Sequence, residues 1–355
     1  MANIYEVAKQ ARVSVATVSA VINSSAYVSP ALKARVTAAI RALRYQPNLL
    51  ARGLALQQSR TIGMIVPNIA NPFWPEVVRG VEDVAHARNY TLLLANSDDD
   101  CAKEALYLEL FLAKSVDGIL LTKAAGGLER RVAERLRSAR APVVQLMRSS
   151  TAVAGEKVLV DEEAGSYEAV THLLRLGYGR IAMINGLWRV STSRRRLMGY
   201  RHALRDWGTP FDPSLVAQGD FRVESGYTAG VDLLKRKPDA MFIASYLMAV
   251  GFMRALRQYQ LRCPEDIGIV TCDDYPWLDS FHPRLTTVNL PKYELGQAAA
   301  RVLLDRLEAK KDERRRRPGR PLVLKTSLCI RESCGYERLV GARLDARPRD
   351  APEPV

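Results

Sequence analysis

The sequence predicts an α/β protein in which a small three-helix, helix-turn-helix domain precedes two lobes of doubly wound parallel sheet. From Ile4 to Leu43 the apolar residues fall at helical spacing in three short blocks, whereas from Thr61 onward short apolar runs alternate with amphipathic helical stretches. The 355 residues are enough for two to three domains, and 48% hydrophobic with 25% charged residues is an ordinary globular composition. A disordered chain and a small disulfide-dependent protein are thereby excluded.

Three helices are expected in the N-terminal unit. Ser14 precedes the second helix, and Ser29-Pro30 opens the third with an N-cap residue followed by proline at the first helical position. The three residues between the first two helices are too few for side-by-side antiparallel packing and suit a helix-turn-helix. The expected helices are Ile4 to Ala11, Val15 to Ile22 and Pro30 to Leu43.

Beyond Thr61 the short apolar runs predict buried parallel strands, and the amphipathic stretches between them predict helices. About 280 residues of this pattern are expected to form two lobes. The expected strands are Thr61–Val66, Thr91–Ala95, Gly118–Leu121, Val143–Leu146, Val158–Val160, Arg180–Ile184, Ala240–Ala244 and Ile267–Thr271. The expected helices lie near Trp74–Arg88, Ala102–Ala113, Leu128–Ala139, Gly165–Leu176 and Arg194–Trp207.

The net charge of +14 favours a polyanionic partner such as nucleic acid, or an anionic surface. Half of it sits in residues 1–60, where eight Lys and Arg face the single acid Glu6 for a net charge of +7. A second concentration occurs in residues 310–321, a Pro- and Gly-containing stretch with seven Lys and Arg and two acids. We interpret this second run as a solvated loop, with an additional DNA-binding arm as the alternative.

Several function classes are disfavoured by what the sequence lacks. The N-terminus has no basic region followed by an apolar segment, and no eighteen apolar residues run together, so neither export nor a membrane span is expected. The five cysteines are scattered without a C-x-x-C pair, which suits a reducing cytoplasm and gives no zinc site. The sequence has no G-x-S-x-G motif and its four histidines lack ligand spacing, so no catalytic residue, metal or cofactor is predicted.

A series of local motifs carries the most specific signal. In chain order they are Ile4-Tyr5-Glu6-Val7-Ala8, Ala11 to Ser19, Asn23, Val28-Ser29, Tyr45-Gln46-Pro47-Asn48, Ala51-Arg52-Gly53-Leu54, Arg60-Thr61-Ile62-Gly63, Val116-Asp117-Gly118-Ile119 and Leu285-Thr286-Thr287-Val288. Over roughly residues 3–335 the sequence resembles the lactose repressor (LacI/GalR) family. The resemblance implies a cytoplasmic transcriptional regulator that binds a pseudo-palindromic DNA operator as a homodimer, and we expect it to act as a repressor. It also implies control by a small-molecule effector, with sugars among the candidates.

The resemblance also divides the chain. It implies a helix-turn-helix DNA-binding domain at residues 1–46, a hinge helix or linker at 47–60, and a periplasmic-binding-protein-like domain for effector binding and dimerisation at 61–340. In this last domain the N-lobe takes about 61–160 and 290–323, and the C-lobe takes about 161–289 and 324–340. Residues 341–355, rich in Arg, Asp and Pro, are expected to form a disordered tail.

In a helix-turn-helix unit the start of the second helix meets base edges in the major groove. Val15 and Ala16 can make only apolar contacts there, for example with a thymine methyl, whereas the hydroxyl and amide side chains further along can hydrogen-bond to bases or phosphates. Ala20 stands where most relatives have Arg or another long polar residue, so we expect a relaxed preference at one operator base pair. The DNA-binding candidates in this unit are Tyr5, Ser14, Val15, Ala16, Thr17, Ser19, Ala20, Asn23 and Ser29.

The segment from Pro47 to Leu56 is too short for a stable isolated helix, so we expect it to fold only against DNA and its dimer mate. By resemblance, paired copies of Leu54 wedge into the central base step of the operator's minor groove. Ala55 stands where relatives often carry Lys, which removes a positive charge from that groove. Asn48 and Arg52 complete the candidate DNA contacts of the segment.

The resemblance places the effector between the lobes, at the carboxyl ends of the strands where open α/β sheets bind ligands. An aromatic face packs on a sugar ring, while Arg and Asp take pairs of hydroxyl groups by charge-assisted hydrogen bonds. Arg196 and Asp273 are the pair that this chemistry favours most. The effector-binding candidates are Asn71, Phe73, Trp74, Met147, Thr192, Arg196, Phe221, Tyr246 and Asp273.

Three matched positions depart from the polar pattern of sugar-binding relatives. Met147 stands where Asp is frequent, Glu162 where Asn is usual, and Tyr246 in place of Asp or Asn. Two interpretations stay open: the effector is less polar or differently charged than a sugar, or the site has decayed. Three nearby arginines would tolerate an anionic ligand, with a solvated helix face as the simpler interpretation; they are Arg189, Arg194 and Arg195.

A solute-binding component of a transport or sensing system is the principal alternative, since it shares the two-lobed fold. Such a component would be exported and would have no use for the basic first sixty residues, so the regulator is favoured. Inducer and corepressor, and dimer and tetramer, stay open as alternatives at this stage.

Overall fold

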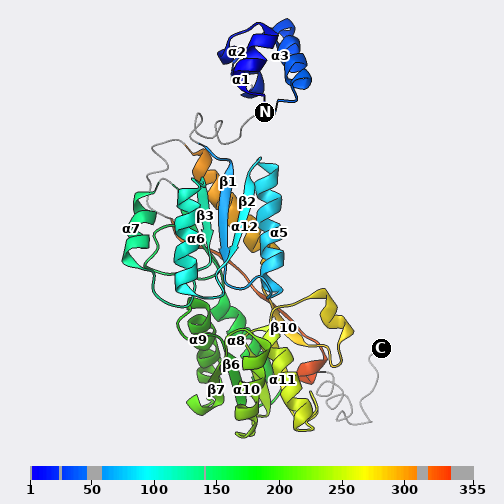
Figure 1. The fold of residues 1–355 in the computed structure, drawn as a ribbon. Helices are drawn as coiled ribbons and strands as arrows, with labels where there is room; N and C mark the ends of the chain where they lie inside the picture. The colour runs from blue at the N-terminus through cyan, green and yellow to red at the C-terminus, as the bar shows by residue number, and fades with distance from the viewer. Residues whose placement is uncertain (1, 24–25, 46–57, 140, 310–318, 337–355) are drawn as a thin grey trace, which may run out of the picture. The chain divides into compact units, whose positions relative to one another are not determined.

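The computed structural model describes residues 2–23, 26–45, 58–139, 141–309 and 319–336 (Figure 1). The chain divides into two compact units, Met1–Arg60 and Thr61–Val355, each with its own hydrophobic core. Most of the expected hinge (residues 47–57), the basic run 310–318 and the expected tail 341–355 lie outside the described residues.

In the described part of the first unit, the helices are α1 (Ile4–Ala11), α2 (Val15–Asn23) and α3 (Pro30–Ala42), within about a residue of the predicted bounds. Val7, Val18 and Val36, one from each helix, are fully buried in a common core. The Asn3 side chain accepts a hydrogen bond from the Glu6 N–H at 3.0 Å, and the Glu6 carboxylate accepts one from the Asn3 N–H at 3.1 Å. This capping box fixes the start of α1.

Both serines predicted to start a helix are in the expected place, but only one of them caps. The Ser14 hydroxyl accepts a hydrogen bond from the Thr17 N–H at 3.1 Å, as an N-cap of α2 should. Ser29 occupies the N-cap position of α3 ahead of Pro30, yet its side chain makes no capping hydrogen bond. The start of α3 therefore depends on the fixed φ of proline.

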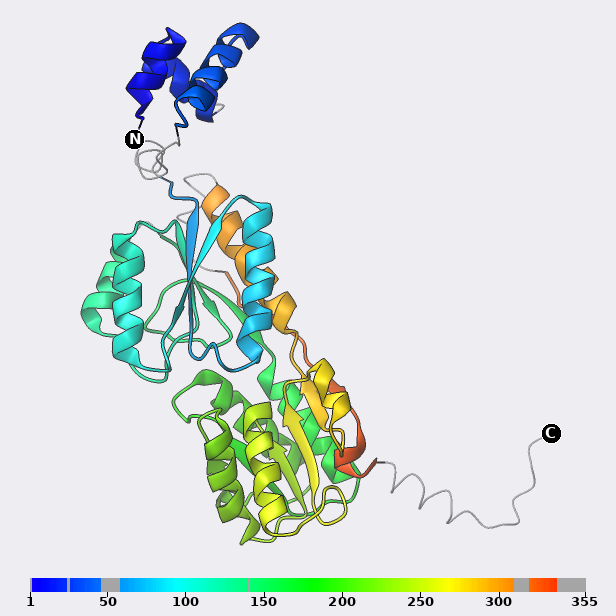
Figure 2. The same ribbon diagram turned by 45° about the vertical axis from the view of Figure 1, so that its right-hand side comes forward.

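Within the described residues, the second unit contains two six-stranded sheets, one in each lobe. The N-lobe strands are β1 (Thr61–Val66), β2 (Thr91–Asn96), β3 (Gly118–Leu121), β4 (Val143–Leu146), β5 (Glu156–Val160) and β11 (Leu322–Leu324). Its helices are α5 (Phe73–Ala87), α6 (Cys101–Ala113), α7 (Arg130–Ser138) and α12 (Lys292–Glu308). The sheet is parallel with the order β11-β5-β4-β3-β1-β2, and α5 and α12 cover one face while α6 and α7 cover the other (Figure 2).

The C-lobe repeats this layered arrangement. Its strands are β6 (Ile181–Asn185), β7 (Val216–Gln218), β8 (Ala240–Ile243), β9 (Gly268–Cys272), β10 (Thr286–Asn289) and β12 (Ser327–Cys329). Its helices are α8 (Glu162–Arg175), α9 (Ser191–Asp206), α10 (Val223–Leu234) and α11 (Tyr246–Gln258), with short 3₁₀ helices η1 (Pro213–Leu215), η2 (Pro276–Ser280) and η4 (Glu332–Cys334). The strand order is β12-β10-β9-β8-β6-β7, with α8 and α9 on one face and α10 and α11 on the other.

The chain passes from one lobe to the other after β5, after β10 and between β11 and β12. The second passage leads into α12, which packs closely on α5. A Cβ on Gly80 would lie 2.1 Å from the Tyr293 carbonyl oxygen, and a Cβ on Gly296 would lie 2.0 Å from the Val77 carbonyl oxygen. Because both distances are far inside van der Waals contact, only glycine allows the two helices this approach.

Most predicted strands and helices are confirmed, and β1, β3 and β4 match residue for residue. The expected burial of Thr91–Ala95 is wrong, because β2 is the edge strand of its sheet and leaves Leu94 43% exposed. The expectation of purely parallel sheets is wrong for β12, which runs antiparallel to β10. The sequence patterns also missed β7, β10 and β12, because each is a segment of three or four residues that contains polar side chains and so shows no continuous apolar run.

No described helix combines the length and the apolar character that a membrane span requires.

Candidate functional site

The first turn of α2 presents small side chains at the surface. Ala16 is exposed, and Val15 and Thr17 are half-buried, whereas Val18 turns fully into the core. The Thr17 hydroxyl lies 2.9 Å from the Ser14 hydroxyl, so the two form one polar edge at the start of the helix. A surface of methyl and hydroxyl groups at a helix N-terminus can approach base edges closely.

The other predicted DNA contacts of the first unit are less uniform. Tyr5 is 71% exposed on α1, while Ser19, Ala20 and Ser29 are half-buried. Asn23 closes α2, and its side chain lies outside the described set. The predicted hinge residues Asn48, Arg52, Leu54 and Ala55 also lie outside the described residues.

One basic residue of this unit has a structural role instead. Arg35 of α3 donates from Nη2 to the carbonyl oxygens of Ala11 and Arg12, at 2.6 and 3.1 Å. It thereby satisfies the C-terminal end of α1, where Arg12 adopts a left-handed conformation with φ of 51°. Arg35 keeps its positive charge, but its guanidinium is directed at these carbonyl oxygens. The other basic side chains of the unit are therefore the candidates for direct contacts with DNA phosphates.

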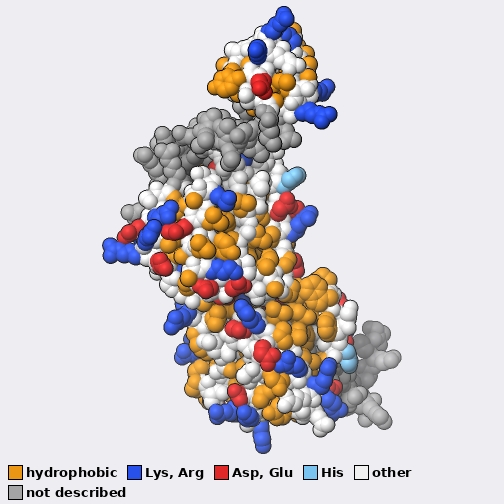
Figure 3. Space-filling model, in the orientation of Figure 1, with side chains coloured by type: hydrophobic (Ala, Val, Ile, Leu, Met, Phe, Trp, Pro, Cys, Tyr) orange, Lys and Arg blue, Asp and Glu red, His pale blue; other side chains and the backbone are white. Residues whose placement is uncertain are grey.

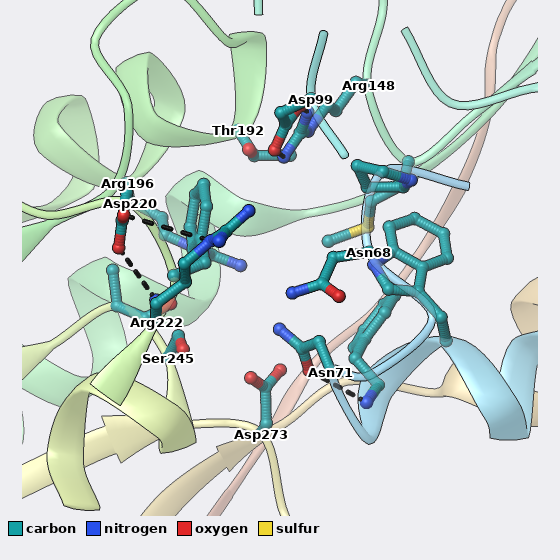
Figure 4. A pocket seen from close by; sticks show the side chains of 16 residues that line it. Asn68, Asn71, Asp99, Arg148, Thr192, Arg196, Asp220, Arg222, Ser245 and Asp273 are labelled. Carbon is teal, nitrogen blue, oxygen red and sulfur yellow. Dashed lines mark hydrogen bonds and ion pairs between the residues drawn. The ribbon is translucent and has the colours of Figure 1, made fainter. Parts of the chain in front are cut away.

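A cavity between the two lobes of the second unit collects most of the predicted effector residues (Figure 4). Eight of the nine line it: Asn71, Phe73, Trp74, Met147, Thr192, Arg196, Phe221 and Asp273. They come from strand ends and helix starts of both lobes, as the rule for open α/β sheets predicts. The cavity measures about 60 Å³, well below the roughly 300–1,000 Å³ of typical small-molecule pockets, so a ligand requires side chains or lobes to move.

The N-lobe wall is set by the start of α5. The Asn71 carboxamide oxygen accepts a hydrogen bond from the Phe73 N–H at 3.0 Å, which fixes the turn before the helix. Phe73 and Trp74 then stand edge to face with ring centroids 5.0 Å apart. Figure 4 shows the amides of Asn68 and Asn71 directed into the same space as the Asp273 carboxylate.

Phe221 forms part of the C-lobe wall, and its position is tightly constrained. A Cβ on Gly186 would lie 1.9 Å from the Phe221 Cζ, so the ring sits directly over the glycine that follows β6. The Arg148 guanidinium of the N-lobe also lies 5.6 Å from the centroid of this ring. The aromatic wall therefore bridges the two lobes through an N-lobe cation.

Arg196 lines the cavity, and each of its three guanidinium nitrogens already donates one hydrogen bond within the protein. Its Nε and Nη2 donate to the two Glu162 carboxylate oxygens at 2.6 and 2.9 Å, and its Nη1 donates to the Ala244 carbonyl oxygen at 2.7 Å. Burial raises the pKa of Glu162, and the facing guanidinium opposes that rise. Glu162 therefore holds the Arg196 guanidinium at the cavity wall, and the predicted role of Arg196 in binding ligand hydroxyls stays a prediction.

Asp273 is the carboxylate that the cavity leaves available. It directly follows β9 in a left-handed conformation with φ of 75°, and it is 5% exposed. Among the described residues its carboxylate receives one hydrogen bond, from the Tyr246 N–H at 3.4 Å. Burial raises the pKa of Asp273, and the positive charges of Arg196 and Lys292 oppose the rise. Such a carboxylate gains from two ligand hydroxyl donors.

The prediction that the Tyr246 side chain lines the cleft is wrong. Its ring turns away from the cavity into an aromatic group, 5.2 Å from the Tyr275 centroid and 6.5 Å from that of Trp277. The residue serves the cleft through its backbone N–H instead, as the donor to Asp273. As the first residue of α11 its backbone faces the strand end, while its side chain belongs to the C-lobe core.

Sequence reasoning missed several polar residues of the cavity. Arg148 forms a bidentate ion pair with Asp99, and its Nη2 to Oδ2 distance is 3.2 Å. Ser245 is 2% exposed, and within the described residues its hydroxyl has no hydrogen-bond partner, which leaves it for a ligand. Arg148 directly follows Met147 and Ser245 precedes Tyr246, so the strand-end rule applied one residue further would have found both. The remaining lining residues are Pro67, Asn68, Asp220, Arg222 and Ala244.

A helix-turn-helix unit with an exposed small-residue helix start, followed by two lobes that enclose a polar cavity, defines a DNA-binding regulator with a periplasmic-binding-protein-like domain. Comparison with known protein families supports this class of protein. The model of bacterial regulatory proteins, lacI family, matches residues 3–48, and that of the periplasmic binding protein-like domain matches residues 170–334.

Catabolite control protein A of Priestia megaterium is 35% identical over 303 residues, which cover 84% of this chain and 91% of that protein. Among solved structures, the complex of the transcriptional regulator CelR with cellobiose is 33% identical with a TM-score of 0.70, and covers 94% of this chain and 100% of that one. The lac repressor dimer bound to operator and the anti-inducer ONPF is 27% identical with a TM-score of 0.81, and covers 94% and 99%. The chain belongs to the lacI family. It is a DNA-binding transcriptional regulator, and the solute-transport alternative is not supported.

Proposed function

We propose that this regulator binds a pseudo-palindromic operator as a homodimer and that a small, uncharged, polar ligand in the lobe cleft controls that binding. The observation that carries the proposal is the origin of the cleft lining: Asn71 and Trp74 belong to the N-lobe, Arg196 and Asp273 to the C-lobe. A ligand that contacts both lobes binds one lobe arrangement more tightly than another. It therefore shifts any equilibrium to which that arrangement is linked.

The charges around the cleft favour an uncharged ligand. Asp99 is paired with Arg148 and Glu162 with Arg196, so both cations are neutralised by buried or half-buried acids. Asp273 adds a carboxylate that can accept from hydroxyl groups, while Phe73, Trp74 and Phe221 supply aromatic surface. Ring stacking plus hydroxyl recognition is the chemistry of a sugar or similar polyol. A cellobiose complex among the similar structures supports this choice.

DNA binding is assigned to the first unit. We place Val15, Ala16 and Thr17 of α2 in the major groove, with Tyr5, Ser14, Ser19, Ala20, Asn23 and Ser29 around them and Asn48, Arg52, Leu54 and Ala55 in the minor groove. The net charge of +7 in residues 1–60 supplies the phosphate contacts, so affinity falls steeply with salt. A protein that works on an operator acts beside the chromosome, so we place it in the cytoplasm, without a catalytic role.

Exposed apolar side chains of the second unit supply a surface for a second copy. Leu106 and Leu110 of α6 are exposed in the N-lobe, as are Trp277 and Phe281 in and beside η2 in the C-lobe. Figure 3 shows hydrophobic side chains gathered over the face that carries α6 and over the segment between β9 and β10. Apolar patches of this kind mark association sites, and the similar lac repressor structure is a dimer bound to operator.

The experiment is a thermal-shift screen of sugars, nucleobases and organic acids, followed by operator titration with and without the hit. We expect a neutral sugar to raise the Tm and to change operator affinity. Asp273→Asn removes the ligand-induced shift, while Asp232→Asn, a change at an exposed carboxylate of α10, leaves it intact. Operator affinity that no stabilising ligand alters would contradict the proposed control, and the direction of the change separates inducer from corepressor.

A further inference from the structure

The second unit holds a second cavity, of about 240 Å³, whose charged lining is entirely basic. Lys123, Arg148 and Lys157 enter it from the N-lobe, and Arg189 and Arg194 enter it from the C-lobe. Among the described residues, no Asp or Glu lines this cavity. The cleft, by contrast, mixes acids and bases in similar number. The two cavities therefore suit ligands of different charge.

Two of the five cations already have carboxylate partners outside the cavity. Lys123 Nζ lies 2.6 Å from the Glu104 carboxylate, and Arg148 is held by Asp99. Within the part of the chain that the structure describes, Lys157, Arg189 and Arg194 form no ion pair. Three positive charges therefore border this space without a counter-charge from the protein: Arg189 and Arg194 are exposed and Lys157 is half-buried, so their summed field attracts an anion.

Neighbouring acids do not neutralise these three. Glu156, next to Lys157 on β5, points to the opposite side of the strand and pairs with Arg306 at 3.7 Å. Arg194 donates from Nη1 to the Arg189 carbonyl oxygen at 3.0 Å, a hydrogen bond that orients its guanidinium without cancelling its charge. Of the three, Arg194 is thus oriented by a hydrogen bond within the protein.

Helix α9 adds to the same field. It begins at Ser191 beside this cavity, its N-cap Val190 has no capping side chain, and its first turn contains no acid. The N-terminal amides of a sixteen-residue helix carry a partial positive charge and point toward an incoming anion. Ser149 to Thr151, on the facing N-lobe loop, add hydroxyl donors.

We propose that this cavity is a second ligand site, separate from the cleft, that takes a phosphate group, either as inorganic phosphate or on a small phosphorylated molecule. Guanidinium and ammonium groups with helix N-terminal amides are the donors that phosphate prefers. The phosphate is bridged between Lys157 of one lobe and Arg194 of the other. The Ser149 N–H already donates to the Ser191 hydroxyl across this junction at 2.9 Å, so the lobes are in contact there.

Arg148 lines both cavities, so the two sites share one side chain. An anion that draws the lobes together on one side changes the arrangement that the cleft ligand meets on the other. Binding of the two ligands is then coupled, and the coupling is reciprocal. This consequence rests on the proposed function, whereas the phosphate site itself does not.

Calorimetric titration of the full chain with inorganic phosphate and, separately, with glucose 6-phosphate tests the site. Glucose and chloride at matched ionic strength are the blanks. We expect saturable binding of at least one phosphate-bearing probe with a Kd below roughly 1 mM. Tighter binding of glucose 6-phosphate identifies a phosphorylated molecule as the source, and tighter binding of inorganic phosphate identifies the free anion.

Variants locate the bound phosphate. Lys157→Ala with Arg194→Ala weakens binding by at least about tenfold, and Arg194→Ala alone weakens it by at least about threefold. Arg195→Ala, the same charge change as Arg194→Ala at an exposed neighbour on α9, alters binding by less than about twofold. If the double variant does not fold, Arg194→Gln, which keeps most of the side chain, decides the same question. Asp232→Asn, a change at an exposed carboxylate of α10 that lines neither cavity, leaves phosphate binding intact. Failure of both probes to saturate, a loss in Arg195→Ala equal to that in Arg194→Ala, or a loss in Asp232→Asn overturns the proposal.

Discussion

Replacing Glu162 by Gln removes one charge of the buried pair at the cleft and keeps the size of the side chain. Arg196 then retains the Ala244 carbonyl oxygen at 2.7 Å but loses the carboxylate that holds its Nε at 2.6 Å and its Nη2 at 2.9 Å. The two side chains are 3% and 4% exposed, so water cannot take over the charge. Breaking such a pair costs about 3–5 kcal/mol.

We expect the lower end of that range, about 3 kcal/mol, because the glutamine oxygen still accepts one hydrogen bond. At about 2 °C per kcal/mol for a unit of this size, the Tm falls by roughly 6 °C. Urea unfolding and thermal melts of the full chain measure both quantities. Glu168→Gln, an exposed change on the same helix α8, is the control and stays within about 0.5 kcal/mol of the parent.

A double variant separates the ion pair from other effects. Glu162→Leu with Arg196→Met replaces both charges by apolar groups, and such replacements of buried pairs are often neutral or stabilising. We therefore expect the double variant to be more stable than Glu162→Gln alone. A Glu162→Gln protein as stable as the Glu168→Gln control, or a double variant less stable than Glu162→Gln, would refute the claim that the guanidinium depends on this carboxylate.

Three further changes test the cleft and the lobe that supports it. Gly186→Ala puts a Cβ 1.9 Å from the Phe221 ring, so the ring must leave the wall and affinity for the cleft ligand falls about threefold to tenfold, measured by calorimetry. Gly296→Ala forces α5 and α12 apart and costs about 1–3 kcal/mol in urea unfolding, while Gly127→Ala, whose Cβ meets nothing within 4 Å, changes stability by less than about 0.5 kcal/mol. The third change, Asp273→Asn, is tested by the pH dependence of folding stability. Because burial raises the folded-state pKa of Asp273 above its ordinary 3.8, the folded parent holds this proton longer than the unfolded chain and loses stability as pH rises from 3.8 to the folded value. The Tm of the Asn variant minus that of the parent should therefore be near zero at about pH 4 and grow toward pH 7, and a constant difference would count against it.

The sequence predicts the repeating elements well because their signals are local. β1 and β3 are continuous apolar runs bounded by polar residues, and their bounds follow from composition alone. The exposure of Leu94 on β2 could not be predicted in the same way. Its run is as apolar as the others, and only the strand order, a long-range property, places it at the edge of the sheet.

In the cleft, too, the sequence predicts where residues lie but not which side chains they contact. The strand-end rule brings eight of nine candidates to one cavity, because parallel strands share a carboxyl edge. The pairing of Glu162 with Arg196 depends on how α8 lies against α9, and no short-range pattern reports that contact. Tyr246 was misplaced for a related reason: it starts a helix, and a rotation of the first turn decides whether the ring or the backbone meets the cleft.

Three consecutive arginines of α9, Arg194 to Arg196, have different surroundings because of the geometry of the helix. Successive residues of a helix point roughly 100° apart, so Arg194, Arg195 and Arg196 must face three different directions. The structure puts the first at the basic cavity, the second in solvent and the third against buried Glu162. The two interpretations of the sequence concern Arg189, Arg194 and Arg195: all three are exposed, as a solvated face requires, and Arg189 and Arg194 also line the basic cavity. Because charge is identical along the run, comparing Arg194→Ala with Arg195→Ala separates position from charge without altering the cleft partner of Arg196.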